Sequence, residues 1–312
     1  MKWSLFAIFT VCAVLMPVLS GCISNIDNQP AEIEVLREAR PVGEAKDLAV
    51  SLKFDVGQFE IAKASDDNLF SFDLQYDKQH YEPKFNFDSS EHATMRLEIN
   101  SQGVNPGRSH DNDLTLRLTN KLPVDLDVTT GVSESNLDMT GLQVRRMNLR
   151  GGVGKTEVTF DRPSGERLRS LDVESGVGEL VIHGLGNTQV ENVSLRGGIG
   201  RTELDFTGDL GTTSSNTIIK VGVGEVRVTI PREADVEIDA QGGFLSNISA
   251  PSFEQNGHTY THRGEAAKAI PLSRPRRTQP KRQPNIPKSK RDRPAISNSA
   301  RISPMTPENL NP

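Results

Sequence analysis

Acidic side chains recur in the second half of the chain at positions that could support acid–base chemistry: Asp172, Glu174, Glu179, Glu203, Asp205 and Glu225. Carboxylates gathered on one face of stacked strands can protonate a glycosidic oxygen and activate a water, which is the chemistry of glycan-cleaving enzymes. Most of these residues alternate with apolar ones, a pattern typical of a solvated strand face. We therefore expect no catalytic residues. A groove of clustered carboxylates would instead indicate the alternative, a carbohydrate-active enzyme.

A second segment with chemical potential is Arg150–Thr156, which has the sequence RGGVGKT. Glycine N–H groups and a lysine at such spacing can hold a phosphate when a helix follows them. Here the next residues, Glu157–Phe160, have the pattern of a strand. The same frame recurs at Gly197–Thr202 with an arginine in the lysine's place, as expected for a structural repeat. We therefore expect no nucleotide and no other cofactor.

Residues that commonly bind metals are scattered. Three histidines stand apart from other ligands in the sequence: His183, His258 and His262. Asp111 and Asp113 could begin a calcium loop. However, Thr115 and Leu116 occupy the positions where that loop needs an oxygen ligand and a glycine. We therefore expect no metal site.

The N-terminal segment has the pattern of a targeting signal. Lys2 precedes an apolar run that extends to Leu19 and is too short and too terminal to be a dependable membrane span. The sequence Leu19-Ser20-Gly21-Cys22 at its end resembles a bacterial lipobox. This resemblance implies a signal peptide over residues 1–21 and lipidation of the Cys22 sulfur. We expect an extracytoplasmic lipoprotein anchored to a membrane, the outer membrane in a cell that has one.

Two segments differ in composition from the part between them. Residues 22–45 are polar and have the character of a tether, with a short strand allowed at Ile33–Leu36. Residues 263–312 contain 12 Lys and Arg against 3 Asp and Glu, and 9 of the 18 prolines lie after residue 270. Such a segment cannot build a core, so we expect it to be disordered. It has no aromatic residues for base stacking, so we expect no nucleic-acid partner.

The segment between them, residues 46–262, has the pattern of an all-β domain. Apolar and polar residues alternate through much of it, as at Leu52, Phe54 and Val56. Alternation of this kind places one face of a strand in a core and the other face in water. We find no helical stripe of three turns in this segment. FDVGQFEI at residues 54–61 has the pattern of the later repeats described next, and the region that follows is less regular.

The second half of this domain repeats. Residues 149–160 read LRGGVGKTEVTF, and residues 195–206 read LRGGIGRTELDF, 46 positions later. SGVGELVI at 175–182 and VGVGEVRV at 221–228 have the same offset of 46. Glycines around a β-branched residue therefore recur at a nearly constant interval: Gly152 and Gly154, Gly176 and Gly178, Gly198 and Gly200, Gly222 and Gly224. A unit of about 22 residues with a glycine turn between strands predicts a single-stranded β-solenoid.

In such a solenoid, we expect each glycine at a corner with positive φ or where stacked backbones leave no room for a Cβ. We expect the central residues to point inward as one aliphatic column: Val153, Val177, Ile199 and Val223. We also expect inward-pointing residues after each corner: Val158, Phe160, Leu180, Ile182, Leu204, Phe206, Val226 and Val228.

The repeated GVG-E-V-x-V and GGIG-x-T-E-L-x-F units, behind a targeting segment, resemble the toast-rack and LiaF-like β-solenoid domains of bacterial envelope proteins. The resemblance covers residues 47–260 and implies an extracytoplasmic, non-enzymatic domain. LiaF-type members are linked to the cell-wall antibiotic response, but they carry transmembrane helices where this chain has a lipobox. Related solenoids close with a final glycine turn and strand, and a basic, proline-rich tail stands there in this chain.

These observations favour a lipid-anchored protein of the cell envelope that acts as a non-catalytic structural or binding module. Its expected partners are the membrane, through the anchor, and envelope proteins or glycans. An uncapped end of the solenoid would expose unpaired backbone groups and allow self-association. The alternative implied by the LiaF resemblance is an accessory role in sensing envelope stress.

Overall fold

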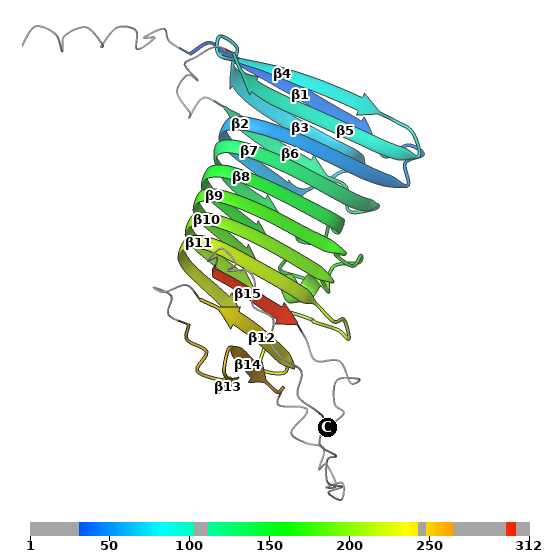
Figure 1. The fold of residues 1–312 in the computed structure, drawn as a ribbon. Coiled ribbons are helices and arrows are strands. Elements are labelled where there is room, and N and C mark those ends of the chain that lie inside the picture. The colour runs from blue at the N-terminus through cyan, green and yellow to red at the C-terminus, as the bar shows by residue number, and fades with distance from the viewer. Residues whose placement is uncertain (1–30, 103–111, 243–247, 265–297, 304–312) are drawn as a thin grey trace, which may run out of the picture.

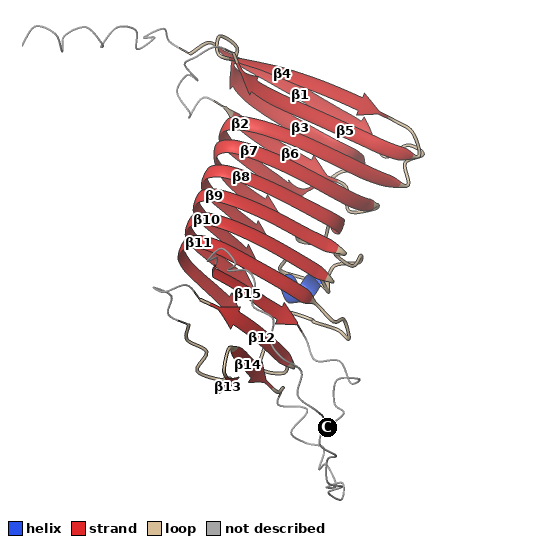
Figure 2. Cartoon of the chain, viewed as in Figure 1, coloured by secondary structure: helices blue, strands red, loops and turns tan. Residues whose placement is uncertain are grey.

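The computed structural model describes residues 31–102, 112–242, 248–264 and 298–303, and these residues form a long stack of strands (Figure 1). Figure 2 shows that the only helical element among them is a short 3₁₀ turn, η1 (Leu185–Thr188). The predicted all-β fold is therefore confirmed. The predicted signal peptide, including Cys22, and most of the basic tail lie outside the described residues.

The centre of the structure is a β-solenoid in which each rung is one long, bent strand (Figure 1). The rungs are β2 (Asp47–Lys63), β7 (Pro123–Asp138), β8 (Gln143–Thr159), β9 (Ser170–His183), β10 (Asn192–Asp205) and β11 (Asn216–Thr229). Each rung pairs in parallel with the next along nearly its whole length. The predicted early rung at residues 54–61 is confirmed, because it lies within β2 and pairs in register with β7.

At the N-terminal end, the two halves of β2 continue into separate layers. The first half pairs with β5 (His92–Ser101), which pairs with β4 (Tyr81–Asp88). The second half pairs with β6 (Asp113–Leu118), and β3 (Asn68–Asp77) and β1 (Ile33–Pro41) follow it antiparallel.

The folded part thus includes β1, which contains the short strand allowed at Ile33–Leu36 and extends further through the segment predicted to be a tether. The side chains of β1 are mostly exposed, several are charged, and the strand ends at Pro41. These are ordinary features of a protected edge strand. The charged side chains of β1 also interrupt the alternation of apolar and polar residues, and for this reason the sequence predicts the start of the all-β domain only at residue 46.

At the C-terminal end, β15 (Asn298–Ser303) pairs antiparallel with the first half of β11 and with β12 (Val236–Gln241). β14 (Thr259–His262) and β13 (Glu254–Asn256) complete this layer. The prediction of a disordered tail is therefore wrong for the residues of β15. A strand that enters between two existing strands is held by backbone hydrogen bonds on both sides, so its sequence needs no strong apolar pattern.

The interior of the solenoid is filled by aliphatic and aromatic side chains from both halves of each rung. Six of the residues predicted to point inward after the corners are buried: Val158, Phe160, Leu180, Ile182, Leu204 and Phe206. The prediction is wrong for Val226, which is 40% exposed, and Val228 is only partly buried. Both belong to the second half of β11, which no described strand covers on its outer side.

The two glycines of each corner meet different constraints. At Gly154, φ is +134°, and a Cβ there would lie 2.0 Å from the carbonyl oxygen of Ser133. Gly152 has no positive φ, but its Cβ would lie 2.3 Å from the carbonyl oxygen of Gly131. The same close approach recurs at the other corner pairs: Gly176 and Gly178, Gly198 and Gly200, Gly222 and Gly224. Successive backbones therefore pass too closely at these glycine positions to leave room for a Cβ.

The corner also reverses the alternation of side chains. In β8, the buried residues before the corner, Met147 and Leu149, have odd numbers, whereas the buried residue Val158 after it has an even number. An extra residue at the bend changes the phase, and Val153 therefore points outward and is 50% exposed. The prediction that the central residues point inward is wrong for each of them: Val153, Val177, Ile199 and Val223. Their direct stacking on one another is confirmed.

The corner constraint predicts a large effect of adding one methyl group. In the Gly178→Ala variant, the Cβ would lie 1.8 Å from the carbonyl oxygen of Gly154, at a φ of +139°. We expect the free energy of unfolding to fall by about 2 kcal/mol or more, measured by urea denaturation. In the control Gly165→Ala, the Cβ would meet only the Gln143 side chain, at 3.9 Å, so little change is expected. Equal losses in the two variants would contradict this account of the corners.

Candidate binding surface

A row of exposed aliphatic side chains runs along the outside of the rung corners. Its members and their exposed fractions are Val132 (49%), Val153 (50%), Val177 (47%), Ile199 (56%) and Val223 (66%). They are direct partners in the parallel register, so they follow one another at the strand spacing of about 4.8 Å. We call this row the corner ridge. A contiguous row of exposed aliphatic residues on a folded domain is typical of an interaction surface.

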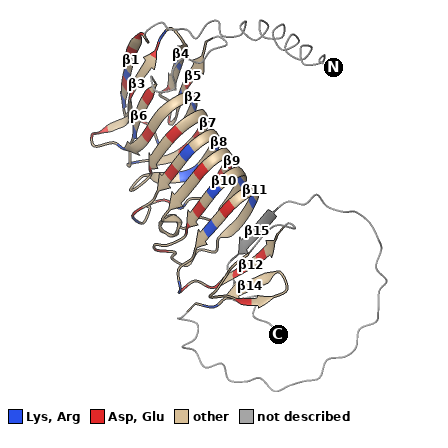
Figure 3. Cartoon of the chain, turned by 90° about the vertical axis from the view of Figure 1, so that its left-hand side faces the viewer, with Lys and Arg blue, Asp and Glu red and all other residues tan. Residues whose placement is uncertain are grey.

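A column of charged residues lies beside the corner ridge, two positions further along each strand. Its members are Glu134, Lys155, Glu179, Arg201 and Glu225, and each is the register partner of the next. Their charges alternate in sign from rung to rung, and Figure 3 shows the charged segments across the stack. We call this row the charge column. The second half of the rungs thus presents an apolar row next to a row of alternating charge.

Hydrogen bonds and neighbouring charges stabilise the cations of the charge column. The pKa of Lys155 is raised chiefly by its hydrogen bond to Glu157, with a further contribution from the charge of Glu179. The pKa of Arg201 is raised in the same way, chiefly by Glu203. Both side chains are therefore positively charged at neutral pH.

The structure places the candidate acidic residues on the outer faces of the strands. Four of them are in ion pairs: Glu174 with Arg196 (2.7 Å), Glu179 with Arg201 (3.6 Å), Glu203 with Arg201 (2.6 Å) and Glu225 with Arg227 (3.0 Å). Asp205 accepts hydrogen bonds from the backbone N–H and hydroxyl of Thr207, and Asp172 is exposed on the first half of β9. Four of the six carboxylates therefore lie beside a cation on the outer surface of the stack.

The glycine-rich segment Arg150–Thr156 lies within β8, as predicted, and Lys155 contacts Glu157 at 3.1 Å. Asp111 lies outside the described residues. The ring nitrogens of His262 lie 3.2 and 3.0 Å from the backbone oxygens of Ser252 and Arg232. In the parts of the chain that the structure describes, no three His, Cys, Asp or Glu side chains are grouped so that they could hold a metal ion.

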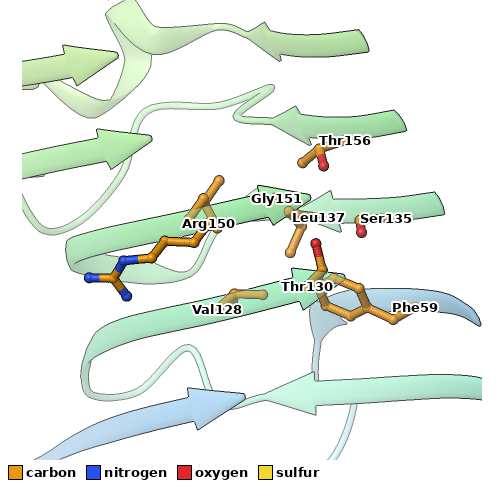
Figure 4. Close-up of a pocket in the computed structure, with 9 residues that line it drawn as sticks. Phe59, Val128, Thr130, Ser135, Leu137, Arg150, Gly151 and Thr156 are labelled. Carbon is orange, nitrogen blue, oxygen red and sulfur yellow. The ribbon is translucent and has the colours of Figure 1, made fainter. Parts of the chain in front are cut away.

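The interior between the two halves of β7 and β8 contains a small cavity (Figure 4). It is lined by Phe59, Val128, Thr130, Ser135, Leu137, Leu149, Arg150, Gly151 and Thr156. Its free volume is about 10 Å³, which is near the lower limit for one water molecule. The cavity is therefore too small for an organic ligand, and binding through this part of the solenoid would use its outer surface.

The in-register rungs and their glycine corners define the chain as a β-solenoid of the toast-rack class. A family model described as the N-terminal domain of toast_rack, DUF2154, matches residues 24–183. This match covers just over half of the chain, so the chain belongs to the toast-rack family. No curated protein matches the sequence. In the described part of the chain, no helix has the length and apolar character needed to cross a membrane.

Several solved structures resemble the fold at low sequence identity. A candidate cell adhesion protein from Clostridium sporogenes is 16% identical, with a TM-score of 0.48 over 64% of this chain and 99% of its own. A candidate adhesin from Bacteroides fragilis is 12% identical, with a TM-score of 0.28 over 63% and 96%. A candidate lipid-binding protein from Parabacteroides distasonis is 10% identical, with a TM-score of 0.26 over 64% and 97%.

Charge pairing also joins rungs on the first half of the stack. Burial raises the pKa of Asp125 in β7, but hydrogen bonds from Arg145 and Arg146 outweigh it, so the pKa lies below its usual value. The guanidinium of Arg145 donates from Nε at 3.0 Å and from Nη2 at 2.7 Å, in a two-pronged contact. This contact connects β7 to β8 where their register shifts by one residue.

The Asp125 contact predicts how stability depends on pH. The pKa of Asp125 is lower in the folded state than in the unfolded state. The Asp125 contact therefore contributes fully to the free energy of unfolding above the pKa of the unfolded state, about 3.9. This contribution is lost as the pH falls through the pKa of the folded state. We expect Asp125→Asn to lower the free energy of unfolding by about 1–3 kcal/mol at pH 7. The difference from the wild type should shrink below about pH 4 in urea titrations. The control Asp127→Asn, at a more exposed ion pair, should cost less than about 1 kcal/mol throughout. A difference that stays constant down to pH 2 would contradict this assignment.

Proposed function

We propose that this protein is a lipid-anchored, extracytoplasmic module of the cell envelope that binds a partner through the corner ridge and catalyses no reaction. The corner ridge carries the proposal. Its five side chains are between 47% and 66% exposed. Burial of apolar surface stabilises a complex by roughly 25 cal/mol per Å², so a continuous aliphatic row favours a partner that covers it.

The repeating order of the surface supports a binding role over a catalytic one. Four of the six candidate acidic residues are paired with cations. A general acid needs a carboxyl group that keeps its proton near neutral pH, and such groups are usually poorly solvated or close to another carboxylate. Paired, half-exposed carboxylates in a ladder are better suited to fixing the register of an interface.

The proposed anchor is Cys22. Ten residues, 23–32, separate it from the start of β1. A chain of this length spans at most about 35 Å, so the solenoid would remain close to the membrane surface. Several acyl chains on one residue give stable attachment, because each buried CH₂ contributes about 0.8 kcal/mol.

Metabolic labelling with an alkyne fatty acid tests the anchor. We expect the wild-type protein to incorporate the label and the Cys22→Ala variant to incorporate none, because the thioether forms on that sulfur. The Cys12→Ala variant is a matched control, since Cys12 lies in the predicted signal peptide and should not affect labelling. Loss of label in both variants, or in neither, would show that Cys22 is not the anchor.

Substitution of the corner ridge tests the binding surface. In a variant with Val153, Val177 and Ile199 changed to Ser, we expect the fold to persist, because these side chains are about half exposed. Formaldehyde cross-linking in intact cells should give at least about tenfold less adduct than the wild type, a loss of about 1.4 kcal/mol of binding free energy. A control with Ile33 and Val35 changed to Ser removes similarly exposed side chains from β1 and should leave the adducts unchanged. Equal adduct yields in the ridge variant and the wild type would refute the proposal.

A further inference from the structure

We propose that the partner of the corner ridge is a second copy of this chain, packed against the first with its stack of rungs antiparallel. This inference rests on the proposed function, because it takes the corner ridge as the binding surface. It adds the identity of the partner, the direction of packing and the register.

The spacing of the corner ridge favours a second stack of strands as the partner. Its side chains stand one per rung, at about 4.8 Å, with glycine on at least one side of each, so the row projects from a surface that is nearly bare. A partner with an aliphatic row of the same repeat can match the ridge along its length. A second copy has that repeat, and a two-fold axis brings the same surface of two copies together.

The charge column determines which two-fold packing is favourable. If the axis runs along the stack at the corner ridge, the two charge columns lie on opposite sides of the ridge and do not meet, so they add no attraction. If the axis is perpendicular to the stack and passes through a rung, the charged residue of that rung faces its own copy, and the contacts on either side of it also join like charges. Like charges placed opposite one another disfavour an interface. The charge column therefore favours neither of these arrangements.

An axis perpendicular to the stack and midway between two neighbouring rungs gives the opposite result, and we place it between β9 and β10, where it covers the most exposed part of the corner ridge. Glu179 of one copy then faces Arg201 of the other, and Lys155 faces Glu225, each twice by symmetry. All four contacts join opposite charges. In the corner ridge, the same axis places Val177 against Ile199. It also places Val153 against Val223, so four rungs of each copy contribute to the interface.

The described strands at the end of the stack lie on its other half. The described strands beyond β11 pair with its first half, at Thr217–Val221, and continue that layer through β15, β12 and β14. On the second half, where the charge column lies, no described strand extends past β11. Rungs of the second copy that reach beyond β11 therefore meet no described layer of the first copy.

Charge reversal tests the packing. Two full-length copies with different tags are co-expressed, the membranes are extracted with detergent, and co-purification of the two copies is measured. We expect wild-type copies to co-purify. When both copies carry Glu179→Arg, or both carry Arg201→Glu, two attractive contacts become repulsive, and we expect at least about tenfold less co-purification. When one copy carries Glu179→Arg and the other Arg201→Glu, every contact across the axis is again between opposite charges. Co-purification should then recover.

The mixed pair keeps the test falsifiable if a reversal lowers stability, because a misfolded chain cannot be rescued by a partner with a different substitution. The control Glu174→Arg breaks an ion pair with Arg196 on the first half of the rungs and should leave co-purification unchanged. Wild-type copies that fail to co-purify would overturn the inference. The proposed function would still stand if the ridge variant loses its cross-links. The inference of antiparallel packing would also be overturned if the reversals in both copies had no effect, or if the mixed pair did not recover co-purification.

Discussion

The structure depends on the close approach of successive backbones at the rung corners. Each corner glycine occupies a position where a Cβ would collide with a carbonyl oxygen of the preceding rung, at 1.8–2.8 Å from Gly152 to Gly224. A slip of one residue between rungs would place a side chain at that position. The corner therefore fixes the register of every rung from β7 to β11, and hydrogen bonds along the strands extend it.

A fixed register turns each position of the repeat into a column, and the corner decides which columns face outward. The phase change at the bend leaves one residue per rung outside, and this residue is Val or Ile in five successive rungs. Their β-branched shape suits an extended backbone, but Thr is equally branched and could hydrogen-bond to water. The consistent choice of aliphatic residues therefore supports a binding role for the corner ridge, beyond its fit to the strand.

The sequence predicted the rungs and their stacking because glycine and β-branched residues recur at a nearly constant interval. It also contained the phase change: Met147 and Leu149 before the corner and Val158 and Phe160 after it have opposite parity. Val153 was expected to point inward together with Val158 and Phe160, and this was wrong for Val153, which points outward at the bend. The strands at the two ends were harder to predict. The strand allowed at Ile33–Leu36 is only the first part of β1, whose charged residues hide its extent, and β15 lies in a basic, proline-rich segment.

Stacking in register also places charged side chains of successive rungs next to one another, and the charge column avoids repulsion between them by alternating in sign. Two like charges at 4 Å repel by about 1 kcal/mol in water, so an outward column of a single sign would destabilise the stack. The first-half column Arg150, Glu174, Arg196 and Lys220 alternates only in part, since its last two rungs are both basic. The charge column beside the corner ridge alternates throughout. Complete alternation is the condition under which an antiparallel copy, displaced by half a rung, meets opposite charges at every contact. The charge column meets this condition and the first-half column does not, so the stability of the stack and the specificity of the interface have the same physical origin.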